Sequence, residues 1–179
     1  MTLTRSALIV ALAALVLVAA RPIAGPAEQY PRGLMSVQPT ASSFACTIEV
    51  RPVSFGIYDP LDATALDALG QVIYTCGNLG DNRASDNKSI RIEMTTGQAN
   101  QFSPRAMRSG PVDDLDYNLY LDATHRTIWG QGLYGTDVYV DTHPPNRTPV
   151  IVPVYGRVFG LQDVPAGQYG DVVTARILF

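Results

Sequence analysis

Asp171-Val172-Val173-Thr174-Ala175-Arg176-Ile177-Leu178-Phe179 alternates along its whole length and predicts a β-strand over 171–179. Successive side chains of a strand point to opposite faces, so one face carries Val173, Ala175, Ile177 and Phe179. The strand ends the sequence without the charged residues or proline that usually protect a sheet edge. Two interpretations follow: an ordinary strand paired inside a closed sandwich, or an edge that another chain fills.

Short segments with strand character also recur upstream, from Phe44 onward. We expect them near 45–57, 70–76, 88–95, 115–121, 126–130, 136–141 and 149–159, followed by 171–179. Glycine, proline, asparagine and aspartate fill the intervals and favour turns. The stretch 62–69 is compatible with one or two helical turns. Seven or eight short strands at this spacing predict an all-β sandwich.

The two cysteines, Cys46 and Cys76, lie in or beside two of these predicted strands. In an oxidising compartment such a pair usually forms a disulfide. A bridge closing a loop of about 30 residues stabilises a fold by roughly 3–4 kcal/mol in the chain-entropy model. Two unpaired buried cysteines are the alternative.

The first twenty residues predict an export signal. Arg5 is their only charge, and residues 7–20 form an uninterrupted apolar run. That run is shorter than the roughly 20 residues that span a bilayer. Cleavage is expected before Arg21, or as late as Ala27. Residues 21–43 then form an extended N-terminal arm and 44–179 the folded domain, with no membrane span in the mature chain.

Composition excludes several classes of function. The net charge is −3 and Lys88 is the single lysine, so we expect no nucleic-acid partner. His125 and His143 lack metal-ligand spacing, and the oxygen-rich loops lack the spacing of a calcium loop. Residues 130–135 match a dinucleotide pattern by letter, but strand-like residues follow them. We expect no metal, no cofactor and no enzyme activity.

Aromatic residues raise the question of a sugar-binding face. Stacking on a carbohydrate is one interpretation, and packing in sandwich cores and corners is the other. The residues concerned are Tyr58, Tyr117, Tyr120, Trp129, Tyr155 and Tyr169. Tyr169 lies two residues before the final strand, and we expect its hydroxyl to bond to backbone.

An ordered set of motifs covers the chain from Cys46 to Phe179. It comprises Cys46, Phe55-Gly56, Tyr58-Asp59-Pro60, Cys76, Arg105 with Met107, Leu115-x-Tyr117-x-Leu119-Tyr120-x-Asp122, Trp129-Gly130, Tyr155-Gly156-Arg157 and Gly167-x-Tyr169-x-Asp171. Each motif is weak alone, and their order carries the comparison. In this order the chain resembles the spore coat protein U family, which includes the subunits of archaic chaperone–usher pili.

The resemblance implies an incomplete immunoglobulin-like sandwich that lacks its final strand and is completed by a donor strand. A periplasmic chaperone lends that strand first. The N-terminal arm of another pilus subunit, added at an outer-membrane usher, replaces it. Val173, Ala175, Ile177 and Phe179 then line one side of the acceptor groove and contact chaperone or subunit. The strand starting near Phe44 lines the other side. The family also implies the Cys46–Cys76 bridge.

The candidate donor strand lies within residues 30–43. One register points Met35, Val37, Pro39 and Ala41 inward, and the other points Leu34, Ser36, Gln38 and Thr40. The first is more apolar, although its proline removes a backbone donor. We therefore expect an exported surface subunit of a pilus or coat, at a rod, adaptor or tip position, in a structure that serves cell adhesion and biofilm formation. A self-contained secreted module that binds carbohydrate or another surface ligand is the alternative.

Overall fold

Strands and loops, with no helix, make up residues 44–78 and 88–179, the part of the chain that the computed structural model describes. The strands are β1 (Phe44–Arg51), β2 (Leu66–Asn78), β3 (Ile90–Met94), β4 (Arg105–Arg108), β5 (Asp114–Tyr120), β6 (Tyr139–Asp141), β7 (Val150–Val158) and β8 (Ala175–Leu178). Since none of these residues is helical, no helix in the described part is long and apolar enough to cross a membrane.

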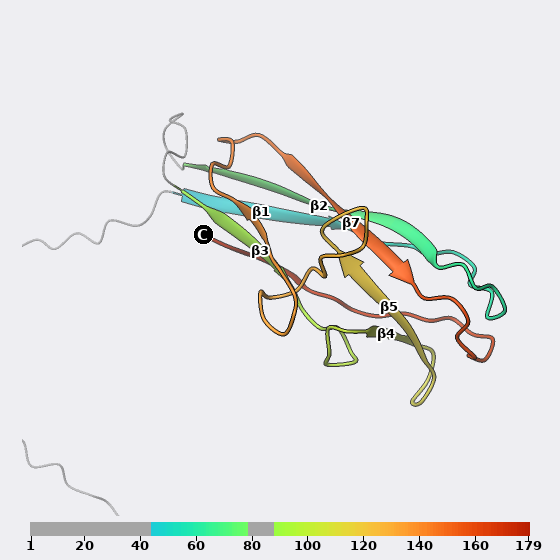
Figure 1. Ribbon diagram of the computed structural model, residues 1–179. Coiled ribbons are helices and arrows are strands. Elements are labelled where there is room, and N and C mark those ends of the chain that lie inside the picture. Colours follow the sequence, from blue (N-terminus) through green and yellow to red (C-terminus); the bar gives the residue numbers. More distant parts are fainter. Residues whose placement is uncertain (1–43, 79–87) are drawn as a thin grey trace, which may run out of the picture. The chain divides into compact units, whose positions relative to one another are not determined.

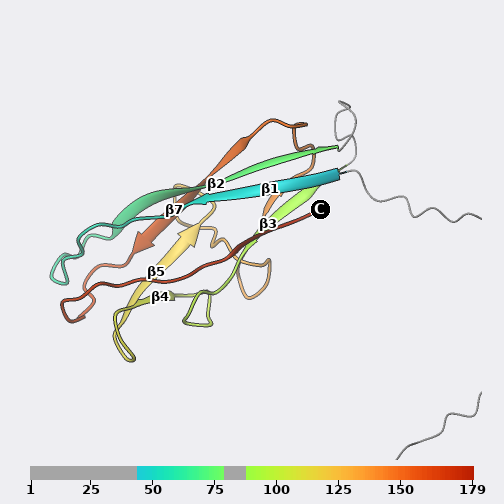
Figure 2. The same cartoon turned by 180° about the vertical axis from the view of Figure 1, so that it is seen from behind.

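The strands form two sheets, shown from opposite sides in Figures 1 and 2. One has the order β1-β2-β7-β5-β4 and the other the order β6-β3-β8. All strand pairs within them are antiparallel. The inner faces carry the apolar half of each alternating pattern, so the core lies between the two sheets. This all-β architecture confirms the predicted fold class.

A buried cation, Arg105, organises the centre of this core. Its guanidinium donates to the side-chain oxygen of Asn118 at 2.7 Å and to the carbonyl of Trp129 at 2.6 Å. It also donates twice to the carbonyl of Thr95, at 3.0 and 3.1 Å. Burial lowers the pKa of Arg105 to about 10, so the group stays charged at neutral pH. One side chain thus links β4, β5 and two loops.

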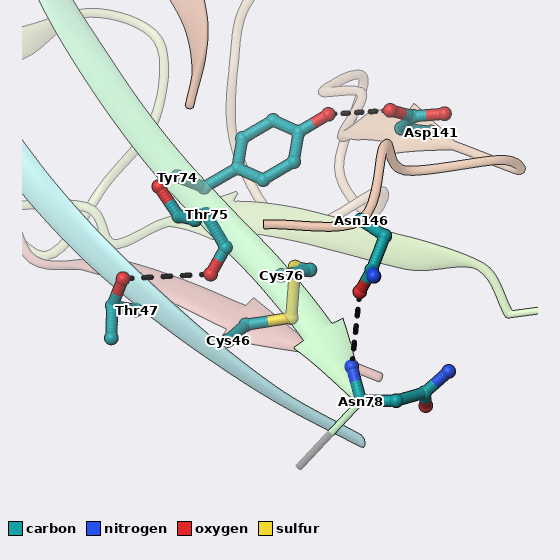
Figure 3. The surroundings of a disulfide bond; sticks show 8 residues. All are labelled: Cys46, Thr47, Tyr74, Thr75, Cys76, Asn78, Asp141 and Asn146. Carbon is teal, nitrogen blue, oxygen red and sulfur yellow. Dashed lines mark hydrogen bonds between the residues drawn. A yellow bond between two sulfur atoms is a disulfide. The ribbon is translucent and has the colours of Figure 1, made fainter. Parts of the chain in front are cut away.

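The disulfide joins Cys46 and Cys76, which stand directly opposite each other on β1 and β2 (Figure 3). On the next residue pair, the hydroxyl of Thr47 donates to the carbonyl of Thr75 at 3.4 Å. The bridge therefore fixes the register of an edge strand against its single neighbour.

Replacing both cysteines with alanine is expected to lower the free energy of unfolding by about 3–4 kcal/mol, because 30 residues separate the bridged positions. Urea unfolding of the purified protein measures this. Thr47→Val beside the bridge is the control, with an expected change below about 1 kcal/mol. Reduced wild type should match the double variant; equal stability of oxidised and reduced protein would contradict the prediction.

The helical turns expected over 62–69 are wrong. The carboxylates of Asp59 and Asp62 accept the backbone N–H groups of Leu61 and Thr64 at 2.9 and 2.8 Å, which makes two tight turns. Strand β2 starts directly afterwards, at Leu66.

The strand expected over 126–130 is also wrong, since the structure has only isolated bridges at Ile128 and Trp129. The carboxylate of Asp122 accepts three following backbone N–H groups and folds this stretch into a loop. Strand β4, in contrast, had not been expected as a strand.

Two of the predicted strands that end shorter than expected border the site. β1 stops at Arg51 and not at residue 57, and β8 covers Ala175–Leu178 and not 171–179. The stretches left over, 52–57 and 171–174, lie outside both sheets. They flank the site described next.

Candidate functional site

The sandwich has an open side between strands β1 and β8. In the described residues, β1 pairs only with β2, and β8 pairs only with β3. Each strand therefore presents a free row of backbone N–H and C=O groups, and the two rows belong to different sheets. β1 runs away from Phe44 while β8 runs toward Phe179, so the two edge strands have opposite directions.

The two edges meet at one end of this opening. The rings of Phe44 and Phe179 pack edge to face with centroids 5.4 Å apart. Figures 1 and 2 show the C-terminus beside the start of β1. Phe44 is buried there, whereas Val50, on the same inward face of β1, is 50% exposed. The edges thus close at the Phe44 end and separate toward Val50.

A cavity of about 860 Å³ opens where the edges separate. Both sheets and two loops line it, and most of the lining side chains are apolar. They include Val50, Val53, Phe55, Tyr58, Met94, Met107, Leu115, Tyr117, Leu119, Val154, Val158, Val164, Tyr169, Val173 and Ala175. We call this cavity and the edges beside it the groove.

Two glycines allow residues 52–56 to form one wall of the groove. A Cβ on Gly156 would lie 2.7 Å from the Phe55 ring, and one on Gly70 would lie 2.7 Å from the Val53 side chain. Phe55 packs in turn against Tyr117, with ring centroids 5.9 Å apart. The segment therefore lies against the inner face of β2 and β7 through its side chains.

The backbone of this wall has no backbone partner among the described residues. Within the described part of the chain, residues 53–58 make no backbone–backbone hydrogen bond. Backbone polar groups near a core ordinarily find partners. An added extended segment lying between this wall and β8 would supply them.

Asp171 sets the shape of the opposite wall. Its carboxylate accepts the hydroxyl of Tyr117 at 2.7 Å and the backbone N–H of Gln98 at 2.8 Å. Gly97 beside it has φ +74°, and a Cβ there would lie 2.0 Å from the carboxylate. Glycine is therefore required at residue 97, and Asp171 holds the chain on its way into β8.

The environment of Tyr117 predicts that the folded protein loses stability at alkaline pH. Burial, followed by its hydrogen bond to Asp171, raises the pKa of Tyr117 well above its usual value of 10. The unfolded chain therefore releases the Tyr117 proton at a lower pH than the folded chain does. The contribution of Tyr117 to the free energy of unfolding is complete below pH 10 and is lost as the pH rises above it. Each pH unit above 10 should remove about 1.4 kcal/mol until the folded protein also titrates.

Tyr117→Phe tests this, by urea unfolding at pH 9 and pH 11. The variant should lose less stability than wild type across that interval. The lowered pKa of Arg105 acts in the opposite direction, and Arg105 interacts with Tyr117 by charge, so the difference between the two proteins measures Tyr117 together with that interaction. Parallel pH profiles would contradict the prediction.

The four predicted groove residues on the last strand lie at different places. Val173 and Ala175 line the cavity, and Ile177 packs against the core closer to the Phe44 end. Phe179 is 63% exposed and contacts Phe44 at the closed end. Their contact with a partner strand stays a prediction. The candidate donor residues Met35, Val37, Pro39 and Ala41 lie outside the described residues, as does the export signal.

Three of the six aromatic residues, Tyr58, Tyr117 and Tyr169, line the cavity. Trp129, Tyr117 and Tyr120 are buried in the described structure. The hydroxyl of Tyr169 donates to the carbonyl of Pro165 at 2.9 Å, as expected from its position before the last strand. Sequence reasoning missed the groove floor: Met107, Leu115 and Leu119 stood in the ordered motifs, but nothing in the sequence showed that they line one cavity.

The sequence is similar to a known domain family and to a known protein. The sequence profile described as Spore Coat Protein U domain matches residues 32–176. Protein U of Myxococcus xanthus is 32% identical over 133 residues, which cover 71% of this chain and 71% of that protein.

Among solved structures, the fold is similar to a chain of the CsuC–CsuE chaperone–tip adhesion subunit pre-assembly complex from archaic chaperone-usher Csu pili of Acinetobacter baumannii. The TM-score is 0.52 at 21% identity, over 76% of this chain and 40% of that one. The Escherichia coli Hda pilus minor tip subunit HdaB gives a TM-score of 0.37 at 18% identity, over 73% and 79% of the two chains. With its sequence motifs, its all-β fold and the profile match in accord, this chain belongs to the spore coat protein U domain family.

Proposed function

We propose that this chain is an exported, non-enzymatic structural subunit of an archaic chaperone–usher pilus or surface coat. The observation that carries the proposal is the groove: an apolar cavity of about 860 Å³ between two unpaired strand edges. A strand added there pairs with free backbone on both sides and covers exposed core. This is recognition by β-strand addition.

Assembly then proceeds in two stages. A periplasmic chaperone first inserts an extended segment into the groove, which keeps the incomplete sandwich soluble. The arm of another subunit, with Met35, Val37, Pro39 and Ala41 facing the core, replaces that segment at an outer-membrane usher. Each fully buried apolar side chain of the arm contributes roughly 1.5–3 kcal/mol. The product is a chain of subunits at the cell surface.

Co-expression in a periplasm tests the proposal. The full chain is produced with and without the chaperone of its own system, and size-exclusion chromatography with mass analysis follows. We expect a soluble one-to-one complex, and aggregation or polymerisation of the subunit alone. A stable monomer that does not bind the chaperone would overturn the proposal.

That second outcome would favour a self-contained binding module. The groove volume lies within the range of about 300–1,000 Å³ typical of small-molecule sites. The two functions differ in what fills the groove. A module keeps its fold with the groove empty, whereas a subunit needs a polypeptide strand there.

A further inference from the structure

Exposed apolar side chains surround the wide end of the groove. Ile57 is 95% exposed, Leu61 87% and Leu161 64%. Their loops are joined, because the backbone N–H of Leu161 donates to the carbonyl of Asp62 at 3.0 Å. We call residues 57–63 and 159–163 the loop pole. Figures 1 and 2 show these loops at the end of the sandwich opposite the C-terminus.

Leu161 carries backbone strain at this pole. Its φ is +56°, in the left-handed region that a bulky side chain rarely adopts. Glycine or asparagine takes such a position without cost. The leucine side chain is nevertheless mainly exposed, so packing inside this domain does not explain its presence. Strain of this kind concentrates at functional contacts.

The two ends of the sandwich also differ in charge. The loop pole, residues 57–63 and 159–163, contains three aspartates and no lysine or arginine. At the other end, Lys88 lies over the Phe44 ring at 6.0 Å, and Arg147 lies beside Asn78. Arg91 is also there, on β3, in an ion pair with Glu93. We call this end, which among the described residues includes Phe44, Lys88, Arg91 and Arg147, the Phe44 pole. Strand β2 runs between the poles, over about 40 Å.

The length of the arm brings these two poles together in an assembled chain. Ala41 is the last proposed donor residue and precedes Phe44 by three residues, which span at most about 11 Å. The Phe44 pole of the donor therefore lies within that distance of the point where its arm leaves the acceptor groove.

That exit point is the open end of the groove. At the closed end, Phe44 and Phe179 are in contact, and the acceptor's own arm begins at Phe44. A donor domain placed there would compete with both. The donor domain accordingly faces the loop pole.

We propose that the loop pole of one subunit binds the Phe44 pole of the next copy, as a second contact beside the inserted strand. The inference rests on the proposed function. Apolar side chains at its centre and opposite charges around them match the usual anatomy of a protein interface. The contact is heterologous, so it repeats along the chain without closing.

Two exchange reactions separate the pole contact from strand insertion. Chaperone-bound full-length subunit is mixed either with itself or with an uncharged synthetic peptide of residues 34–43. Polymer growth is followed as oligomers that resist detergent without boiling. Peptide capture is followed as chaperone release. The peptide brings a donor strand but no Phe44 pole.

Leu161→Gly is the first variant, because it removes the side chain and relieves the strained backbone. We expect polymer growth about tenfold slower and peptide capture unchanged. Leu61→Ser should act in the same direction. Leu69→Ser is the matched control, since Leu69 is similarly exposed but lies on the solvent face of β2.

Variants that swap a negative charge at the loop pole and a positive charge at the Phe44 pole test whether the two charges attract each other. Asp163 is suitable because its carboxylate makes no hydrogen bond or ion pair within the described residues. Asp163→Lys and Lys88→Glu should each slow polymer growth, and the double variant should recover it, because each subunit supplies both poles. Salt should slow growth of the wild-type polymer but not capture of the uncharged peptide.

The outcomes are distinct. Slower polymer growth with normal peptide capture supports the pole contact. Normal polymer growth in all pole variants, with normal peptide capture, overturns the contact and leaves the proposed function intact. A peptide that releases no chaperone overturns both.

Discussion

Val173→Asp is expected to abolish capture by the chaperone. Val173 lines the groove wall and packs against the core. A carboxylate there faces the inserted strand in an apolar, water-excluding site, at a cost of several kcal/mol. The yield of one-to-one complex after periplasmic co-expression should fall by about a hundredfold or more, since 1.4 kcal/mol corresponds to tenfold.

Val172→Asp is the matched control. It adds the same charge one residue earlier, at a side chain that is 72% exposed and points away from the groove. We expect near-normal complex formation. Equal loss in both variants would mean that charge at this segment, and not the groove, decides capture.

Ile177→Asp and Phe179→Asp extend the test toward the closed end. Ile177 packs against the core, so its replacement should be nearly as severe as that of Val173. Phe179 is mostly exposed, so the effect there should be smaller. Unchanged capture in both would contradict the assignment of the last strand to the groove.

Arg105→Met is expected to lower the free energy of unfolding by about 3 kcal/mol or more. The substitution keeps an apolar stem of similar length but leaves the carbonyls of Thr95 and Trp129 without their donor, while the side-chain oxygen of Asn118 keeps only the N–H of Leu119. Each buried unsatisfied polar group costs about 1–3 kcal/mol. Thermal unfolding of the chaperone-bound protein measures the effect.

Arg108→Met provides the comparison from the same strand. Arg108 donates to the carboxylate of Asp114 at 2.9 Å on the surface. Exposed pairs of this kind contribute at most about 1 kcal/mol. If the two variants unfold at the same temperature, the buried network is not the organising element described above.

The sequence predicted the strands that alternate over many residues. Strand β7 and residues 70–76 of β2 alternate without interruption between buried and more exposed side chains, and both were expected close to their true positions. Strand β4 was missed because Arg105-Ala106-Met107-Arg108 does not alternate: its first three residues, an arginine among them, are all buried. The helical expectation over 62–69 failed because Leu66 and Leu69 have helical spacing while local carboxylate turns decide the backbone.

The groove was accessible from sequence only in part. Alternation placed Val173 and Ala175 on one face, but it did not reveal that residues 171–174 leave the sheet. Nor could local pattern show that Gly70 and Gly156, 86 residues apart, make room for the side chains of Val53 and Phe55. Such long-range fit is a property of the folded chain.

Trp129 gives the protein an internal optical probe. It is the single tryptophan, it is fully buried, and its indole N–H donates to the carbonyl of Ile92 at 2.9 Å, in the strand next to β8. Its emission should therefore be blue-shifted in the native state and move to longer wavelength when the two layers separate. Trp129 fluorescence can therefore report, without any added label, whether the two sheets stay packed together during strand exchange.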